Sequence, residues 1–308
     1  MNAISDPLVS LSNRTAELTA AAGAQVLRVE GRRRSPSSGV AWSNDLVVTT
    51  HHALERDEEV EVGLPDGGTA PAVVVGRDPS TDLALLRLQA GRAPALAPAS
   101  FADGAPLAAG HLVLAVSRPG RTVRAALGLV ARAAPEWRGH SGGRIDRWLE
   151  TTLDLYPGLS GALALSAAGE AVGLVTAGLV RGSAMIVPAE TLRRVIGALA
   201  EHGGVRRGYL GVATSPVRLP AAVASAAGQE GALLVSAVEP DSPAAAGGLL
   251  LGDAILTLGG AAVSDYGDLL PLLEEDRIGK PLPARVLRAG EVRELPLVVG
   301  TRARRSGR

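Results

Sequence analysis

The sequence contains no cysteine, which excludes disulfide bridges, thiol catalysis and zinc sites built on cysteine in these 308 residues. Phenylalanine occurs once, at Phe101, and 31 basic residues balance 31 acidic ones to a formal charge of zero. A balanced chain gives no reason to expect a nucleic-acid partner or an anionic membrane surface. What is present is an apolar fraction of 46%, ample for buried cores, in a chain whose length suits about two domains.

The first thirty residues lack the features of an export signal. They carry Asp6, Glu17 and Glu30, and no basic segment leads into an apolar run. The mostly apolar segment 20–27 is too short to span a membrane and is interrupted by a glycine and a glutamine. We therefore expect no membrane span and a cytoplasmic location. The alternative is a periplasmic protein whose export signal is hidden by a misassigned start codon.

The first two-thirds of the chain consist of short strand-like runs separated by glycine, proline and aspartate. Their even spacing predicts β-barrels or a sandwich and does not fit alternating βαβ units. The segment 65–68 (PDGG) is a hairpin-turn signal between two of these runs. We expect strands at residues 39–42, 46–49, 59–64, 72–75, 83–88, 111–116, 125–130 and 171–177.

From Pro188 the pattern becomes helical and then that of a second, smaller unit. Residues 189–200 place four apolar side chains on one helical stripe, and the glycines at 203–204 end that helix. Beyond residue 208 we expect a small strand-rich domain with two helices. Its strands are expected at residues 231–235, 254–258, 284–287 and 294–298, and its helices from Ser242-Pro243 and over 265–274.

Ser160 is the candidate nucleophile, in the segment 156–162 (YPGLSGA). A serine hydroxyl needs a base to take its proton and donors aimed at the oxyanion that its attack creates. The amides of Gly158 and Ser160 are the expected donors of this oxyanion hole. Taken alone, a Gly-x-Ser-Gly segment is equally typical of an ordinary turn.

His52 is the candidate base and Asp82 its candidate carboxylate partner. His52 follows a strand-like run, and His51 is the rival base, separated from it only by register. Asp82 precedes an apolar strand, where it would hold the histidine in the right tautomer. Taken alone, His52 could be a partly buried histidine and Asp82 a turn residue. Together with Ser160 they follow the chain order His, Asp, Ser of trypsin-like peptidases, which differs from that of subtilisins and α/β-hydrolases.

Three segments resemble the motifs of the HtrA (high-temperature requirement, Deg) peptidases. Residues 47–54 (VVTTHHAL) are similar to the family's Val-Thr-Asn-x-His-Val, and residues 74–86 (VVGRDPSTDLALL) to its aspartate strand. Residues 156–162 resemble its Asn-Pro-Gly-Asn-Ser-Gly-Gly. The resemblance runs from about residue 17 to 300 and implies a mainly β chain with a trypsin-like double β-barrel. It also implies a cofactor-free serine endopeptidase that cleaves exposed segments of unfolded or misfolded proteins.

The C-terminal unit resembles the PDZ domain of the same family. Residues 207–212 (RGYLGV) match the carboxylate-binding loop, which implies that Tyr209, Leu210, Gly211 and Val212 bind peptide C-termini. For Tyr209 and Leu210, core packing is a second and compatible role. The expected domains are therefore an N-terminal extension (1–16), a peptidase domain (17–203), a linker (204–207), a small α+β PDZ domain (208–300) and a basic tail (301–308).

Several residues depart from the family pattern. Leu159 replaces an asparagine or aspartate, and Ala162 replaces the second glycine, which favours the alternative of a catalytically weak PDZ scaffold or chaperone. Asp154 falls where trypsin-like enzymes place the base of the S1 pocket, so it predicts either a preference for lysine or arginine or merely a solvent-facing loop acid. The resemblance leaves a homotrimer open, because the aromatic contacts that build family trimers cannot be mapped onto a chain with one phenylalanine.

Overall fold

The computed structural model describes residues 6–32, 35–55, 60–91, 94–102, 107–139 and 142–301. The chain divides into two compact units, Met1–Val205 and Arg206–Arg308. This division falls inside the predicted linker 204–207. The expected basic tail lies outside the described residues, apart from Thr301.

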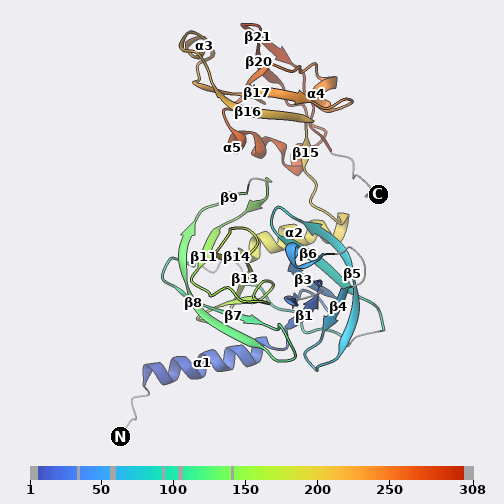
Figure 1. Ribbon diagram of the computed structural model, residues 1–308, viewed down its shortest axis with the longest axis vertical. Helices are drawn as coiled ribbons and strands as arrows, with labels where there is room; N and C mark the ends of the chain where they lie inside the picture. Colours follow the sequence, from blue (N-terminus) through green and yellow to red (C-terminus); the bar gives the residue numbers. More distant parts are fainter. Residues whose placement is uncertain are drawn as a thin grey trace. The chain divides into compact units, whose positions relative to one another are not determined.

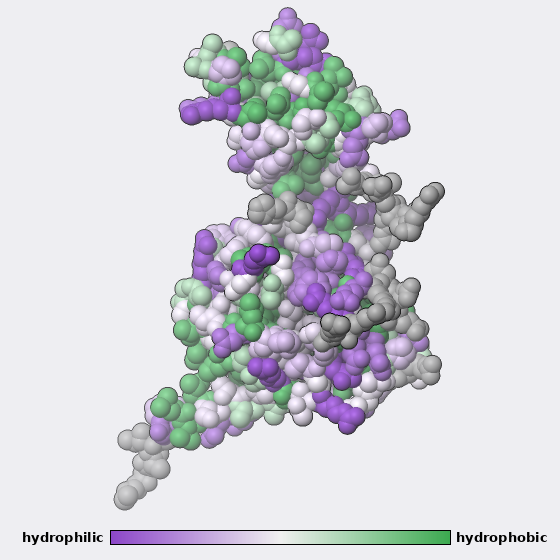
Figure 2. Space-filling view, viewed as in Figure 1, coloured by the Kyte–Doolittle hydropathy of each residue, from purple (hydrophilic) through white to green (hydrophobic). Residues whose placement is uncertain are grey.

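The first unit begins with helix α1 (Pro7–Ala22), which the sequence analysis did not anticipate (Figure 1). Asp6 caps the helix by accepting a hydrogen bond from the amide of Leu8 at 2.9 Å, and Pro7 supplies a first residue whose φ already suits a helix. The helix crosses the predicted domain boundary at residue 16. Its first turns expose Leu8, Val9 and Leu11, and apolar surface is visible there in Figure 2.

Two closed six-stranded barrels follow, as the double-barrel fold class predicts. In the first barrel the strands neighbour one another in the order β1-β2-β3-β6-β5-β4, and in the second in the order β11-β14-β13-β12-β7-β8. The first barrel comprises β1 (Val26–Glu30), β2 (Ser37–Ala41), β3 (Leu46–Thr50), β4 (Val60–Gly63), β5 (Thr69–Asp78) and β6 (Leu83–Leu88). The second comprises β7 (Leu112–Ser117), β8 (Arg124–Ala134), β11 (Trp148–Thr151), β12 (Leu163–Ser166), β13 (Ala171–Thr176) and β14 (Ala184–Pro188).

Every strand expected in this unit lies in one of the barrels, although Glu59 at the edge of one expected run is outside the described residues. The PDGG segment joins β4 to β5, with the amide of Leu64 donating to the carbonyl of Gly68 at 2.8 Å. A short hairpin of β9 (Trp137–Arg138) and β10 (Arg144–Ile145) extends from the second barrel. The turn and apolar signals therefore located eight of the twelve barrel strands, whereas β1, β11, β12 and β14 were not predicted.

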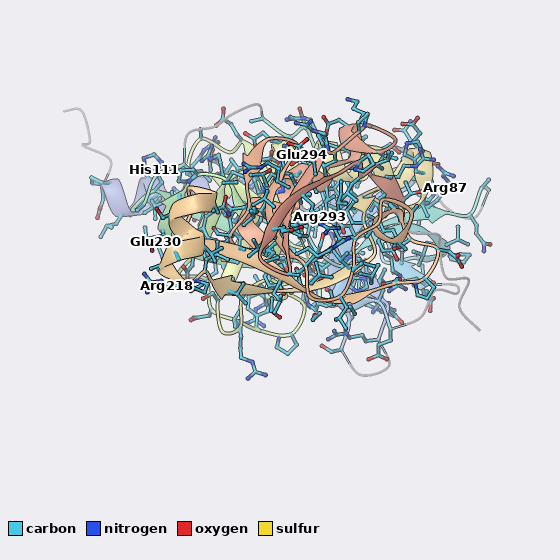
Figure 3. All side chains as sticks on the ribbon, turned by 90° about the horizontal axis from the view of Figure 1, so that it is seen from above. Arg87, His111, Arg218, Glu230, Arg293 and Glu294 are labelled. Carbon is cyan, nitrogen blue, oxygen red and sulfur yellow. The ribbon has the colours of Figure 1, made fainter. Side chains whose placement is uncertain are left out.

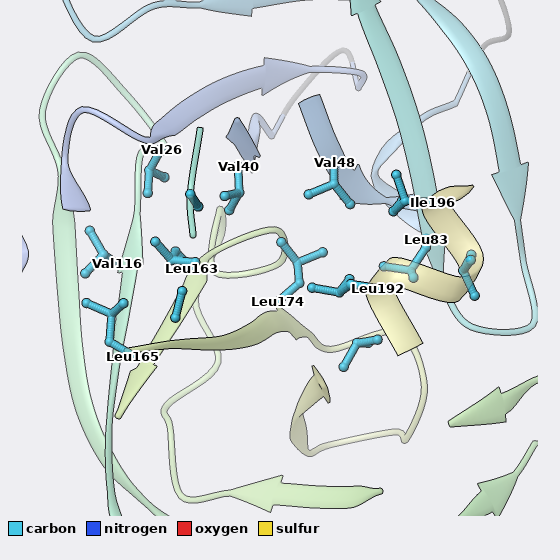
Figure 4. Close-up of a cluster of buried hydrophobic side chains, with 14 of the residues drawn as sticks. Val26, Val40, Val48, Leu83, Val116, Leu163, Leu165, Leu174, Leu192 and Ile196 are labelled. Atoms are coloured by element: carbon cyan, nitrogen blue, oxygen red, sulfur yellow. The ribbon is translucent and has the colours of Figure 1, made fainter. Parts of the chain in front are cut away.

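A shared apolar core joins the two barrels, in addition to the core inside each. Helix α2 (Ala189–His202) closes it with Leu192, Val195, Ile196 and Leu199, each at most 1% exposed, which confirms the predicted stripe. The helix ends at Gly203, whose left-handed φ of 67° suits glycine. Figure 4 shows valines and leucines of both barrels converging on this helix. Because the core spans both barrels, residues from either one can be held rigidly where they meet.

The second unit is a twisted sheet in the order β16-β17-β18-β20-β21 with short helices. The expected helix over 265–274 is wrong in its second half, which is a 3₁₀ turn because Pro271 lacks the N–H that an α-helix needs. The expected strand 294–298 ends earlier than predicted, at Leu295 before Pro296. Helix α3 was not predicted; beside it Arg218 and Glu230, labelled in Figure 3, form a 3.0 Å ion pair.

The strands of this unit are β15 (Gly208–Tyr209), β16 (Val212–Arg218), β17 (Gly231–Val238), β18 (Ala254–Leu258), β19 (Ala261–Ala262), β20 (Ala284–Arg288), β21 (Glu291–Leu295) and β22 (Gly300–Thr301). The helices are α3 (Ala221–Ala227), α4 (Pro243–Ala246) and α5 (Tyr266–Leu269), and the 3₁₀ turns of the chain are η1 (His51–Ala53), η2 (Leu270–Leu273) and η3 (Glu275–Arg277).

Candidate active site

Each candidate triad residue lies where a barrel strand meets a loop. His52 lies in the 3₁₀ turn η1, which follows β3, and Asp82 directly precedes β6. Ser160 lies in the loop between β11 and β12 of the second barrel. Because β3 pairs with β6, with Thr50 opposite Leu83, the histidine and the aspartate are adjacent although thirty residues separate them.

The imidazole of His52 is held by a buried carboxylate. The Nδ1 atom of His52 lies 2.7 Å from Oδ2 of Asp82, and the Asp82 side chain is only 4% exposed. The other carboxylate oxygen accepts the backbone N–H of His52 at 2.9 Å. The hydroxyl of Thr176, at the end of β13, also donates to Oδ2. These contacts fix the ring so that Nδ1 carries the proton and Nε2 is free to accept one.

His51 takes no part in this arrangement through its side chain. Its backbone N–H donates to the carbonyl of Asp82 at 3.0 Å, but its Nδ1 is buried without a hydrogen-bond partner among the described residues. Burial lowers the pKa of His51, and the charge of Asp82 only partly offsets that effect. The lowered pKa favours the neutral form of His51, and its Nδ1 makes no hydrogen bond to the Asp82 carboxylate.

Ser160 and His52 line the same pocket, whose volume is about 140 Å³. The Oγ of Ser160 accepts the amide N–H of Ala177 at 3.2 Å, which places the hydroxyl at the end of β13. Two side chains from the first barrel and one from the second are thus gathered at the junction of the barrels. The arrangement can support attack by a hydroxyl oxygen with an imidazole as the proton acceptor.

Strand β2 of the first barrel fixes the loop around Ser160 through hydrogen bonds that were not predicted from the sequence. The Ser37 hydroxyl and the Ser38 amide both donate to the carbonyl oxygen of Ser160, at 2.6 and 3.0 Å. The Ser38 hydroxyl donates to the carbonyl oxygen of Gly158 at 2.8 Å. Neither the Gly158 amide nor the Ser160 amide has an acceptor within the described parts of the chain. Both amides are therefore available as oxyanion donors.

Two glycines of this loop are required by their surroundings. Gly158 has φ of 90°, and a Cβ there would lie 2.3 Å from Cβ of Pro119. Gly161 has φ of 86°, and a Cβ there would lie 1.8 Å from the Ser38 carbonyl oxygen. The Gly-x-Ser-Gly spacing is thus imposed by the close approach of Pro119 at Gly158 and of the β2 backbone at Gly161, and not by a generic turn.

The two residues that depart from the family pattern are both buried in the core of the second barrel. Leu159 is 1% exposed and Ala162 is fully buried. Leu159 anchors the loop by apolar packing, a role open to a leucine because its side chain points into the barrel. Ala162 donates its amide to the Leu159 carbonyl at 2.9 Å, and its φ is not positive, so a glycine is not needed there.

The turn before Asp82 is rigid as well. Asp78 accepts hydrogen bonds from the hydroxyls of Ser80 and Thr81, both at 2.7 Å, which is typical of an aspartate in a turn. Asp82 has φ of 57°, a left-handed conformation that aspartate tolerates better than most residues. Gly143, beside β10, approaches so closely that a Cβ would lie 2.2 Å from the Ser80 carbonyl oxygen. The β9–β10 hairpin therefore packs directly on this turn.

Asp154, the candidate S1 residue, is exposed and does not line the pocket that contains Ser160. The structure thus places it on the surface of the loop between β11 and β12. Its proposed preference for basic side chains stays a prediction.

In the second unit Tyr209, Leu210 and Gly211 of the carboxylate loop precede the edge strand β16, and Val212 is its first residue. Leu210 is 2% exposed in the core, and its carbonyl accepts the amide of Ala244 at 2.8 Å. Gly211 has φ of 81°, and a Cβ there would lie 2.3 Å from Cβ of Ser242. The hydroxyl of Tyr209 donates to Glu239. Leu210 therefore packs in the core, while Val212 begins the strand to which a peptide could be added.

The free edge of β16 is partly occupied by a tyrosine. β16 pairs with β17 and is the first strand of the sheet. Proline in a strand turns its nitrogen away from the neighbouring strand, so Pro216 and, two residues earlier, Thr214 face the free edge. The hydroxyl of Tyr266, from α5, donates to the Thr214 carbonyl oxygen. A peptide that adds to this edge would compete with Tyr266 for that acceptor.

Two family models match the chain: a trypsin-like peptidase domain over residues 37–174 and a PDZ domain over 208–299. A probable periplasmic serine endoprotease DegP-like from Marinomonas sp. (strain MWYL1) is 29% identical over 287 residues, 91% of this chain and 60% of the relative. Serine endoprotease DegS of Haemophilus influenzae is 28% identical and covers 85% of this chain and 76% of its own length. The chain spans about half to three-fifths of the DegP-like relatives' length.

Solved structures agree with these sequence matches. The HtrA-type protease AlgW with a decapeptide has a TM-score of 0.74 at 26% identity, covering 94% of this chain and 99% of that protein's chain. The same protease with a tripeptide has a TM-score of 0.72 at 28% identity, covering 95% and 99%. Within the described residues, no helix is both long and apolar enough to cross a membrane.

Proposed function

The chain belongs to the HtrA/Deg-type trypsin-like serine peptidases that carry a PDZ domain, and from this premise we propose that it is an endopeptidase whose catalytic triad is His52, Asp82 and Ser160. The observation that carries the proposal is the 2.7 Å contact between His52 Nδ1 and Asp82 Oδ2 beside the pocket that also contains Ser160. The proposed substrates are exposed segments of unfolded or misfolded proteins.

In the proposed mechanism His52 Nε2 takes the proton of the Ser160 hydroxyl as Oγ attacks the substrate carbonyl carbon. The Gly158 and Ser160 amides stabilise the resulting oxyanion. His52 then gives its proton to the leaving amine, and an acyl-enzyme on Ser160 remains. Water, deprotonated by His52, attacks the acyl carbon, and His52 returns this proton to Ser160 Oγ as the ester bond breaks and the carboxylic acid product leaves. Throughout, the Asp82 carboxylate stabilises the imidazolium without itself being protonated.

The decisive experiment compares the wild type with Ser160→Ala in casein proteolysis and in labelling by a fluorophosphonate. The substitution should reduce the rate by roughly 10³–10⁶-fold and abolish labelling. Ser43→Ala is a matched control, because that hydroxyl lies in an exposed turn 2.9 Å from Asp45. Equal, near-zero activity and no labelling in the wild type and in Ser160→Ala would instead support a PDZ scaffold or chaperone.

For the second unit we propose peptide binding by strand addition to β16, with the peptide carboxylate at the loop around Gly211. This assignment is supported by the PDZ family match over 208–299 and by the edge position of β16. A fluorescent decapeptide with a free C-terminal carboxylate should bind, and its C-terminally amidated form should bind much more weakly. Equal affinity for both forms would exclude carboxylate recognition.

We propose the periplasm as the site of action, as the names of the DegP-like relatives state for those proteins. The cytoplasmic location expected from the N-terminal residues has no support from the relatives. A homotrimer, and the expected absence of a nucleic-acid partner, stay predictions. Fractionation of cells that express the complete gene, together with light scattering of the purified protein, would test the location and the assembly.

A further inference from the structure

We propose that Arg32 makes the pocket beside Ser160 a subsite for an acidic substrate side chain on the leaving-group side of the scissile bond. This inference rests on the proposed peptidase function and adds a substrate preference to it. The relevant pocket is the one of about 140 Å³ that contains His52 and Ser160.

The pocket has two walls, and none of the described residues that line them is a carboxylate. One wall comes from the segment before and within β2, with Ser35, Pro36 and Ser37, and the other from the Ser160 loop, with Tyr156 and Pro157. The polar groups of the lining, apart from Arg32, are hydroxyl groups and the imidazole of His52. An acidic side chain entering it would meet hydrogen-bond donors and no like charge.

Arg32 supplies the positive charge. One guanidinium nitrogen donates to the backbone carbonyl of His52, which holds the group beside the catalytic residues. A guanidinium has five N–H donors, so this bond leaves others available for a carboxylate. Within the described ranges Arg32 forms no ion pair. Its charge is therefore not already neutralised by a neighbour in that part of the chain.

A second cation lies behind the opposite wall. The guanidinium of Arg124 stacks over the Tyr156 ring, 3.6 Å from the ring centroid. The Tyr156 hydroxyl is 3.0 Å from the Ser117 hydroxyl, which fixes the ring in place. Both walls of the pocket are thus flanked by arginine, so the local potential favours an anion.

The position of His52 determines which side of the scissile bond the pocket serves. In the proposed mechanism the imidazole donates its proton to the leaving amine, so the residue that carries this amine lies against His52. His52 and the following residue, Ala53, both line the pocket. On the other side of Ser160, Oγ contacts the Ala177 amide at the end of β13. The pocket therefore faces the first residues after the cleaved bond.

The test uses internally quenched peptides built on a site that the enzyme cuts in casein. The residue at the first or second position after the scissile bond is glutamate, glutamine or lysine, and mass spectrometry verifies the cleavage site. At one of these positions kcat/KM should be about three- to tenfold higher for glutamate than for glutamine, with lysine lowest. Salt should reduce this ratio, because partly exposed charges are screened.

Three substitutions and one control complete the design. The glutamate-to-glutamine ratio should fall to about one in Arg32→Gln, persist in Arg32→Lys and invert in favour of lysine in Arg32→Glu. Arg87→Gln, an exposed arginine on β6 labelled in Figure 3, should leave the ratio unchanged. Equal cleavage of all peptides by the wild type would overturn this inference but not the proposed function. A glutamate-to-glutamine ratio that stays unchanged in Arg32→Gln would do the same. If the wild type neither cleaved casein nor reacted with a fluorophosphonate, the proposed function itself would be overturned.

Discussion

The hydroxyl of Ser38 donates a 2.8 Å hydrogen bond to the carbonyl oxygen of Gly158, 120 residues away in the chain. The same oxygen atom of Ser38 accepts the backbone N–H of Arg118 at 2.9 Å. A strand of the first barrel thereby holds the loop that carries the proposed oxyanion donors, and it does so from a fully buried position.

Removing this hydroxyl should impair catalysis more than substrate binding. In Ser38→Ala the Gly158 carbonyl loses its donor, and the peptide unit can rotate so that the oxyanion donors are less well aimed. We expect kcat to fall by about ten- to a hundredfold with little change in KM. Steady-state kinetics on a quenched peptide, with Ser43→Ala as the control, would measure the effects on kcat and on KM separately. A rise in KM at constant kcat would contradict the role given to Ser38.

The two adjacent histidines should differ sharply in importance. His52→Ala removes the proposed base and should cost roughly 10³–10⁶-fold in kcat/KM. His51→Asn should stay within about threefold of the wild type, since the His51 ring does not contact the Asp82 carboxylate. Casein proteolysis by both variants would show which histidine is the base. A large loss of activity in His51→Asn, with little loss in His52→Ala, would assign that role to His51.

His51 also predicts a dependence of stability on pH. Its pKa is lowered in the folded state, so the unfolded chain binds a proton first as the pH falls below the ordinary histidine value near 6.5. The contribution of neutral His51 is therefore fully present above that pH and is lost as the pH falls through the lowered pKa. His51→Asn should lose less free energy of unfolding between neutral and mildly acidic pH than the wild type does. Urea titrations at several pH values would show this as a smaller shift of the midpoint.

Restoring the family's polar residue at position 159 should not improve the enzyme. Leu159 is buried in the apolar core of the second barrel, so an asparagine there would bury an amide that lacks prepared partners. We expect Leu159→Asn to lower the free energy of unfolding by about 1–3 kcal/mol and to leave kcat no higher. Leu159→Met, which keeps an apolar side chain of similar volume, is the matched control. A more active Leu159→Asn enzyme would mean that the leucine does limit hydrolysis.

Tyr266 should weaken peptide binding by the second unit, because its hydroxyl occupies the Thr214 carbonyl on the free edge of β16. Tyr266→Phe removes that competitor and keeps the ring. We expect the Kd for a free-carboxylate decapeptide to decrease by about two- to tenfold, the worth of one hydrogen bond. Fluorescence anisotropy would measure it, and an unchanged or larger Kd would show that Tyr266 does not compete with the ligand.

Most of the barrel strands could be predicted, and the three candidate catalytic residues could be proposed, because their signals are local. Turn residues punctuate the barrel strands, and His52, Asp82 and Ser160 each lie in a short segment whose pattern is recognisable by itself. The contacts of Ser37, Ser38 and Thr176 could not be predicted, because they join residues more than ninety positions apart and depend on how the barrels meet. Helix α1 does carry a local signal, because Asp6 caps it and Pro7 is its first residue.

Among the described residues, each of the two units has buried apolar clusters of its own. Because a domain with its own core can unfold as a unit, heat should denature the protein in two successive calorimetric transitions. Loss of the C-terminal fold would then leave an intact barrel pair, and a cell could inactivate ligand recognition without destroying the hydrolytic half of the molecule.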